Sequence, residues 1–320
     1  MSSSEFAVET TRLTKDFDSL RAVNEIDLTI ENSEIFGLLG PNGAGKTTTI
    51  RLLSGMLIPT FGKAKVLGMD SVEKSLQIRE KTGLLTETPS IYDRLSVREN
   101  LTFFGRIYGV KSEDIQKNIK KLLEIFDLEE RIDSKAGTLS KGMKQKVAIA
   151  RTLIHDPELI FLDEPTASLA PESAKIVRDL ILNLAKESNK TFFIATHNLY
   201  EAEILCDRVA IINRGNILAV GKPKELKEMM KGETYTIIRF QEWNNEVENF
   251  LETNNYKISN LVQEERKIQI KLKDIEKETP PLIKKLIENN YNIVEVFHER
   301  PSLEKIYLEL VERETNGGVK

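Results

Sequence analysis

The first two thirds of the chain alternate short apolar runs of strand length with segments of helical periodicity. This alternation extends from about residue 6 to residue 219 and is typical of an α/β layer fold. Three of the runs, at residues 34–40, 159–162 and 191–195, are almost continuously apolar, as are strands buried on both faces of a parallel sheet. The first run ends in glycine and leads through a loop into a helical segment. We therefore predict a parallel-sheet core.

The pattern changes after a boundary between residues 221 and 232, which contains a short charged helical segment, Lys224–Met230. Beyond it, Ile268, Ile270 and Leu272 alternate with polar residues, which is the period of a strand with one face in water. Further strands are predicted at residues 235–240 and 293–297, and helices near residues 243–251, 282–287 and 303–310.

The predicted order in this second part, up to the final helix, is strand, helix, two strands, helix, strand. That order favours a small ferredoxin-like α+β domain. We place the boundary so that residues 1–225 form the α/β domain and residues 233–320 form the accessory domain.

Composition restricts the possible partners and location. The net charge of −4 gives no basic excess, so nucleic acid is not an expected partner. No apolar run reaches the 18 or so residues of a membrane-spanning helix, and residues 1–5 show no secretory signal. We expect a cytoplasmic chain whose membrane role, if any, requires another chain. The single cysteine, Cys206, is expected to be a buried apolar residue.

A phosphate-binding loop follows the first apolar strand. Residues 40–47 read Gly-Pro-Asn-Gly-Ala-Gly-Lys-Thr, and this pattern between a strand and a helix lets backbone N–H groups converge on phosphate oxygens. Lys46 is expected to reach the outer phosphates and Thr47 to bind magnesium. The predicted ATP-binding residues of the loop and helix are Gly40, Pro41, Asn42, Gly43, Ala44, Gly45, Lys46, Thr47 and Thr48.

Two adjacent acidic residues end the second apolar strand. Asp163 is placed to hold magnesium through water, and Glu164, beside it, can deprotonate the attacking water as general base. Simple capping of the strand is the alternative, which the phosphate loop disfavours.

The family is indicated by residues 139–145, Leu-Ser-Lys-Gly-Met-Lys-Gln, which resemble the signature segment of ABC ATPases. Ser140 lies 23 residues before Asp163, at the spacing of that family. Pro165-Thr166 follows Glu164, and Thr196-His197 follows the third apolar run. Together these motifs make residues 6 to about 225 resemble an ABC ATPase domain, a P-loop NTPase domain with a parallel-sheet core and a helical subdomain.

The resemblance implies a head-to-tail dimer with two ATP molecules between the subunits. Ser140 and Gly142 of one subunit would face Lys46 of the other. In the family, the histidine equivalent to His197 senses the γ-phosphate, and an aromatic residue in the position of Phe17 stacks on adenine. An ordinary helix N-cap is the alternative role for Ser140, and a core position is the alternative for Phe17.

Two positions depart from the family pattern. Glu87 stands where the family usually has a glutamine that touches magnesium, but a glutamate can still reach a metal, so the predicted metal ligands are Thr47, Glu87 and Asp163. Ala170 stands where the family expects an aspartate in the loop that contacts the opposite subunit. Either the coordination of the two sites is weakened or the partner is a different ABC ATPase, so homodimer and heterodimer both stay open.

We therefore expect the ATP-binding subunit of an ABC transporter, using ATP and Mg²⁺ and lying peripherally on the inner face of the cell membrane beside integral membrane subunits. Residues 301–307 resemble the tail of ATPase subunits of drug, lipid or polysaccharide exporters, which favours export; a generic amphipathic helix is the alternative.

Two other functions are disfavoured. Soluble ABC ATPases that act on ribosomes or DNA usually fuse two ATPase domains or insert long coiled coils, and this chain has one phosphate loop and no heptad run. A regulatory ATP-binding protein without turnover would not need both Glu164 and His197.

The Ala170→Asp substitution tests the second departure. We expect it to raise the ATPase rate of the dimer or to tighten its coupling, because it restores the carboxylate that the family places there. The measurement is steady-state ATP hydrolysis with its dependence on ATP concentration. An unchanged rate together with unchanged coupling would contradict the expectation.

Overall fold

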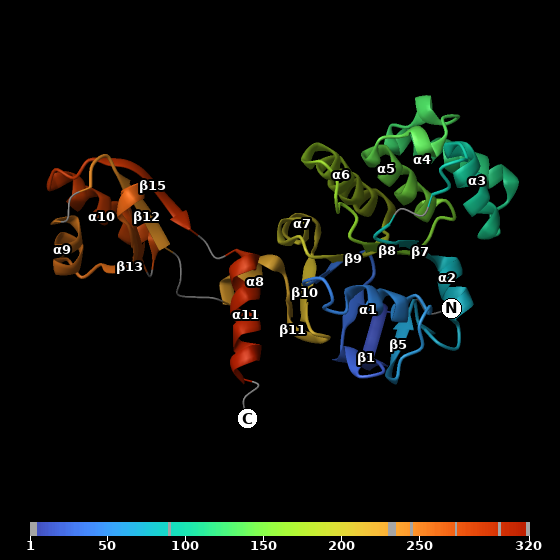
Figure 1. Cartoon of the computed structure of the whole chain (residues 1–320), viewed down its shortest axis with the longest axis horizontal. Helices are drawn as coiled ribbons and strands as arrows, with labels where there is room; N and C mark the ends of the chain where they lie inside the picture. Colours follow the sequence, from blue (N-terminus) through green and yellow to red (C-terminus); the bar gives the residue numbers. More distant parts are fainter. Residues whose placement is uncertain are drawn as a thin grey trace. The chain divides into compact units, whose positions relative to one another are not determined.

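The computed structural model describes residues 5–88, 91–229, 235–243, 246–272, 274–299 and 302–317 (Figure 1). Internal contacts divide the chain into two compact units, Met1–Pro223 and Lys224–Lys320. Met230 of the predicted helical segment and Pro301 of the exporter-like tail lie outside the described residues. So do residue 273 and residues 231–234 of the expected boundary.

The first unit contains a six-stranded sheet in the order β11-β10-β4-β9-β8-β7. Its strands are β4 (Ile35–Leu39), β7 (Thr82–Leu85), β8 (Leu159–Asp163), β9 (Thr191–Thr196), β10 (Arg208–Asn213) and β11 (Asn216–Gly221). All neighbours except β10 and β11 run parallel. Every residue of β4, β8 and β9 is buried, so the continuously apolar runs do form central parallel strands as predicted.

A second, antiparallel sheet was not predicted from the sequence. It comprises β1 (Phe6–Phe17), β2 (Leu20–Ile26), β3 (Thr29–Glu31), β5 (Phe61–Val66) and β6 (Met69–Asp70). Helix α1 (Lys46–Leu53) shares one buried core with both sheets, to which β1 contributes Val8, β4 Phe36 and α1 Ile50. The strands of this sheet mix buried and exposed positions irregularly, because bulges shift the register of β1 against its neighbours.

Helices between β7 and β8 form the predicted helical subdomain (Figure 1). They are α3 (Val97–Ile107), α4 (Ser112–Phe126) and α5 (Lys141–Leu153), which pack on one another, with short turns of 3₁₀-helix at Glu129–Arg131 and Ala136–Thr138. The start of α3 is fixed by a capping box: Ser96 Oγ accepts from Glu99 N, and the Glu99 side chain accepts from Ser96 N.

The remaining helices of the first unit are α2 (Ser75–Lys81), α6 (Pro171–Ser188) and α7 (Leu199–Leu205). Cys206, directly after α7, is buried as predicted, and burial raises the pKa of its thiol. A membrane-spanning helix, sufficiently long and apolar, does not occur among the described residues.

The second unit confirms the predicted ferredoxin-like order. Its elements are α8 (Pro223–Met229), β12 (Tyr235–Phe240), α9 (Glu246–Thr253), β13 (Lys257–Val262), a 3₁₀ turn (Gln263–Glu265), β14 (Lys267–Lys271), α10 (Ile275–Glu288), β15 (Ile293–Glu299) and α11 (Leu303–Gly317). The four strands pair in the order β13-β14-β12-β15, with every pair antiparallel. Both α9 and α10 contribute side chains to the core of this unit, so they cover the same face of the sheet.

Two adjacent residues of α10 test this packing. Leu286 is fully buried in the core, whereas Ile287 is 60% exposed. We expect Leu286→Ala to lower the free energy of unfolding of this unit by about 2–5 kcal/mol, because it leaves a cavity. Ile287→Ala is the matched control and should change it by no more than about 0.5 kcal/mol.

The measurement is urea unfolding of the full chain followed by tryptophan fluorescence. The chain has one tryptophan, Trp243, and it packs against the core of the second unit, so its emission reports on that unit alone. Equal shifts of the urea midpoint in the two variants would contradict the assigned packing.

Candidate nucleotide site

The phosphate loop connects β4 to α1. Gly45 stands at the N-cap of α1 with φ of 108°, and a Cβ there would lie 2.3 Å from the carbonyl oxygen of Ala22, so only glycine fits. No side chain caps the helix at this end. The N–H groups of its first turn, which lack partners within the helix, therefore point to an anion as their acceptor.

Lys46 is almost completely buried, with 6% of its surface exposed. Its Nζ donates to the carbonyl oxygens of Gly40 at 2.7 Å and Pro41 at 3.1 Å, and lies 3.3 Å from Glu164 Oε1. The ammonium group thus lies between the phosphate loop and the predicted general base, where the negative charge of a terminal phosphate would be neutralised.

Thr47 and Asp163, predicted as metal ligands from distant parts of the chain, are in direct contact. Thr47 Oγ1 donates to Asp163 Oδ2 at 2.8 Å. Burial raises the pKa of the Asp163 carboxyl, and the hydrogen bond from Thr47 opposes that shift. The predicted third ligand, Glu87, lines the same pocket.

These residues fit a magnesium ion that takes its other ligands from phosphates and water. Magnesium at nucleotide sites needs only one or two carboxylates from the protein. A cluster of three or more His, Cys, Asp or Glu side chains that could hold a metal does not occur among the described residues.

Glu164 and His197, the predicted catalytic residues, lie side by side. Glu164 Oε1 accepts from the backbone N of His197 at 3.1 Å and lies 2.8 Å from His197 Nδ1, while Oε2 lies 3.3 Å from Thr196 Oγ1. Glu164 is 7% exposed and has the left-handed φ of 52°, whereas the side chain of His197 is 54% exposed. The carboxylate is therefore oriented from β9, and the imidazole remains accessible to a phosphate.

Most of the residues predicted to bind ATP or magnesium line one pocket of about 480 Å³. It is lined by Phe17, Leu20, Ala22, Asn42, Gly43, Gly45, Lys46, Thr47, Thr48, Glu87, Asp163 and Glu164. Two further predicted residues, Gly40 and Ala44, are buried, and Gly40 N donates to the carbonyl oxygen of Thr196 at 3.2 Å. The sequence analysis missed Leu20 and Ala22, which carry no motif and reach the pocket only through the register of the β1–β2 hairpin.

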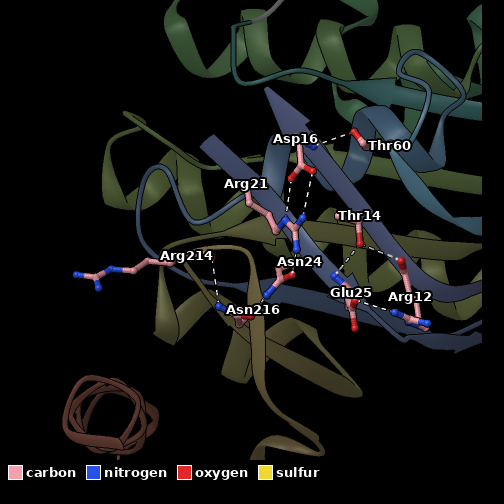
Figure 2. Close-up of polar contacts among 9 residues, drawn as sticks. All are labelled: Arg12, Thr14, Asp16, Arg21, Asn24, Glu25, Thr60, Arg214 and Asn216. Atoms are coloured by element: carbon pink, nitrogen blue, oxygen red, sulfur yellow. Dashed lines mark hydrogen bonds and ion pairs between the residues drawn. The ribbon is translucent and has the colours of Figure 1, made fainter. Parts of the chain in front are cut away.

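Phe17 is 41% exposed at the tip of that hairpin, where it pairs with Leu20. Figure 2 shows the polar contacts that anchor the tip: Asp16 receives two hydrogen bonds from Arg21, at 2.8 and 3.2 Å, and Asp16 N donates to Thr60 Oγ1 at 3.0 Å. The bonds from Arg21 lower the pKa of the Asp16 carboxyl. These contacts therefore hold the tip of the hairpin that carries Phe17.

The same network reaches the β10–β11 turn. Arg21 Nη1 donates to Asn24 Oδ1 at 3.2 Å, and Asn24 Nδ2 donates to Asn216 Oδ1 at 2.7 Å (Figure 2). Gly215, in that turn, donates its backbone N–H to the carbonyl oxygen of Ala44 at 2.9 Å. These bonds connect the aromatic hairpin to the phosphate loop.

Ser140 and Gly142 lie at the start of α5. The Ser140 hydroxyl accepts from Met143 N at 3.3 Å, so it has the N-cap role that was its alternative interpretation. Neither residue is among the described residues that line the pocket. Within one chain, this second helix terminus is therefore not part of the phosphate site built around Lys46.

Ala170 is the N-cap residue of α6 and makes no side-chain capping bond. An aspartate there would also cap the helix and stabilise it by about 0.5–2 kcal/mol. The thermal stability of an Ala170→Asp variant therefore has to be measured beside its ATPase rate.

Comparison with known proteins identifies the family. Residues 23–167 match the family described as ABC transporter, and residues 221–311 match the family described as ATP-binding protein DrrA1-3-like, C-terminal domain. The ABC transporter ATP-binding protein NatA of Bacillus subtilis (strain 168) is 40% identical over 221 residues, which cover 68% of this chain and 89% of that relative. The chain belongs to the ATP-binding proteins of ABC transporters.

Other relatives of this ABC ATPase carry names of specific transporters. The bacitracin transport ATP-binding protein BcrA of Bacillus licheniformis is 42% identical, with coverage of 66% of this chain and 68% of the relative. The Nod factor export ATP-binding protein I of Rhizobium sp. (strain N33) is 39% identical, with coverage of 70% and 74%.

The fold agrees with the family. The structure of cbiO1 from Clostridium perfringens, part of the ABC transporter complex cbiONQ, matches with a TM-score of 0.65 at 28% identity, covering 70% of this chain and 91% of that one. This ABC ATPase is thus a transporter subunit that binds and hydrolyses ATP, and the comparisons do not support the alternative function on ribosomes or DNA.

Glu164→Gln tests the general base of this ABC ATPase. The amide keeps the size of the side chain but cannot take a proton, so we expect ATP hydrolysis to fall at least about 100-fold while ATP binding persists. Single-turnover hydrolysis and equilibrium nucleotide binding are the measurements. The matched control is Glu158→Gln, directly before the start of β8, where the side chain forms an exposed ion pair with Lys81. Rapid turnover in Glu164→Gln would reject the assigned base.

Proposed function

We propose that this chain energises an exporter as one subunit of a head-to-tail ATPase dimer, located on the inner face of the cell membrane beneath separate integral membrane subunits. The observation that carries the proposal is the separation of the two helix termini: Lys46 lies in the pocket with Asp163 and Glu164, whereas Ser140 and Gly142 do not. A second subunit supplies the missing half of each site. Export is supported by the exporter and antibiotic-transport names of the relatives.

In the proposed reaction, Lys46 and the first turn of α1 bind the β- and γ-phosphates, and Phe17 stacks on adenine. Glu164 accepts the proton of the attacking water, and the exposed ring of His197 contacts the γ-phosphate. Thr47, Asp163 and Glu87 would hold Mg²⁺, which neutralises phosphate charge when bound. Each of these roles uses a side chain that faces the pocket or adjoins Glu164.

The membrane partner is proposed to dock on the segment between Glu87 and Gly109. A surface pocket of about 350 Å³ here is lined by Tyr92, Asp93, Arg94, Leu95 and Phe103. Tyr92 and Phe103 are 50% and 39% exposed and pack edge to face, with ring centroids 5.2 Å apart. Exposed aromatic pairs around a hollow are typical of protein–protein anchoring sites.

Helix α3 holds the backbone of this pocket at Tyr92. The side chain of Asn100, on α3, is buried; its Oδ1 accepts from Tyr92 N at 2.8 Å and its Nδ2 donates to the carbonyl oxygen of Tyr92 at 3.0 Å. A load on the pocket would therefore reach α3 through the bonds between Tyr92 and Asn100.

Co-purification tests the proposal. The tagged chain, isolated from detergent-solubilised membranes of its own cells, should arrive with an integral membrane protein. A Tyr92→Ala, Phe103→Ala double variant should lose at least about tenfold of that partner while keeping ATP binding, since aromatic anchors carry most interface energy. Leu76→Ala, at a position on α2 that is 69% exposed and outside this pocket, is the control and should keep the partner. Ribosomes or nucleic acid in place of a membrane protein would contradict the proposal.

A further inference from the structure

A buried carboxylate of the first unit has no role in the reaction described above. Glu201, in α7, is 1% exposed, and burial raises the pKa of its carboxyl. Its Oε1 accepts from Thr166 Oγ1 at 2.8 Å and its Oε2 from Thr196 Oγ1 at 2.7 Å. A carboxylate is costly to bury. Two short hydrogen bonds offset this cost for Glu201 and fix the position of its carboxylate.

The two threonines flank the catalytic residues. Thr196 directly precedes His197, and its hydroxyl also lies 3.3 Å from Glu164 Oε2. Thr166 follows Glu164 by two positions and leads into the loop, residues 167–170, that is expected to contact the opposite subunit. Glu201 therefore holds the segment after the general base and the segment before the histidine with one side chain.

The Thr196 hydroxyl lies between the carboxylates of Glu201 and Glu164. A hydroxyl donates one hydrogen bond at a time, and Glu201 Oε2 is nearer to it than Glu164 Oε2, at 2.7 against 3.3 Å. The hydroxyl therefore donates to Glu201, and this bond fixes the side chain of Thr196 beside Glu164. The fixed position of the Thr196 oxygen in turn sets where the Glu164 carboxylate lies.

A further contact extends this arrangement to the signature helix. Gln145, in α5, donates from Nε2 to the carbonyl oxygen of Pro165 at 2.6 Å. The helix that begins at Ser140 is thus joined through Pro165 and Thr166 to Glu201. The side chains along this path are all buried: Gln145, Thr166, Glu201, Thr196 and Glu164.

We propose that Glu201 is a positioning residue for ATP hydrolysis, which orients Glu164 through Thr196 and ties that orientation, through Thr166 and Gln145, to the signature helix. The first part concerns one chain only. The second part rests on the proposed head-to-tail dimer, because there the signature helix contacts the nucleotide of the opposite subunit and would report its presence to Glu164.

Glu201→Gln tests the first part. The amide group has the same size, but its NH₂ can donate to the Thr196 oxygen and turn the hydroxyl proton toward Glu164. We expect kcat to fall about tenfold, equivalent to about 1.4 kcal/mol in the barrier, with the KM for ATP and the nucleotide affinity within about twofold of wild type. Glu203→Gln makes the same change at an exposed position of the same helix and serves as the control.

Thr166 provides the conservative rescue. Thr166→Ser keeps the hydroxyl and should keep kcat within about twofold, whereas Thr166→Val keeps the shape, loses the hydroxyl and should lower kcat as Glu201→Gln does. An unchanged kcat in Glu201→Gln, or equal loss in the Ser and Val variants, would overturn the positioning role. So would a fall in ATP affinity that matches the fall in kcat.

A double-mutant cycle tests the link to the signature helix. We expect the double variant Gln145→Met, Glu201→Gln to lose less kcat than the product of the two single fold losses. Both substitutions interrupt the same chain of contacts, so the second should add little to the first. Independent effects would overturn the link. The molecular mass of the Glu164→Gln variant in solution with ATP tests the proposed dimer separately. A monomer would reject the dimer, whereas the result for Glu201 within one chain would still hold.

Discussion

Two acidic residues at the end of β8 set the requirements that the rest of the site meets. Asp163 and Glu164 are both buried, and a buried carboxylate is stable only when hydrogen-bond donors or cations surround it. Asp163 receives its bond from Thr47, and Glu164 is contacted by Lys46 and His197. The phosphate loop and the loop after β9 thus hold the acidic pair in place. The negative charge of the pair in turn holds the ammonium group of Lys46.

Strand order makes these contacts possible. In the parallel sheet β9 lies between β4 and β8, so the carboxyl ends of the three strands open at the same edge. The phosphate loop follows β4, the acidic pair ends β8 and His197 follows β9. Binding sites of parallel α/β sheets lie at this edge, because loops from neighbouring strands converge there. The antiparallel sheet adds the aromatic hairpin to the same pocket.

The helical subdomain carries the part of the proposed site that the pocket around Lys46 lacks. Ser140 caps α5, and it is not among the residues that line that pocket. In the proposed dimer, the second subunit brings this helix terminus to the nucleotide. The buried contacts of Gln145 and Glu201 connect the start of α5 with the pocket around Lys46. These contacts lie in the part of the chain that other subunits would contact.

Local order along the sequence determined much of this protein. Apolar runs predicted the central strands, and the alternation of polar and apolar residues with the order of strands and helices predicted the ferredoxin-like domain. The phosphate loop, Asp163 and Glu164 could be named because their motifs depend on spacing over a few residues, and His197 through the resemblance to the family. The antiparallel sheet, the hairpin contacts of Phe17 and the role of Glu201 could not. They depend on bulged registers and on hydrogen bonds between residues tens of positions apart, such as Thr166 with Glu201. Only the folded chain brings such residues together, because no short-range pattern encodes a contact made by packing one loop against another.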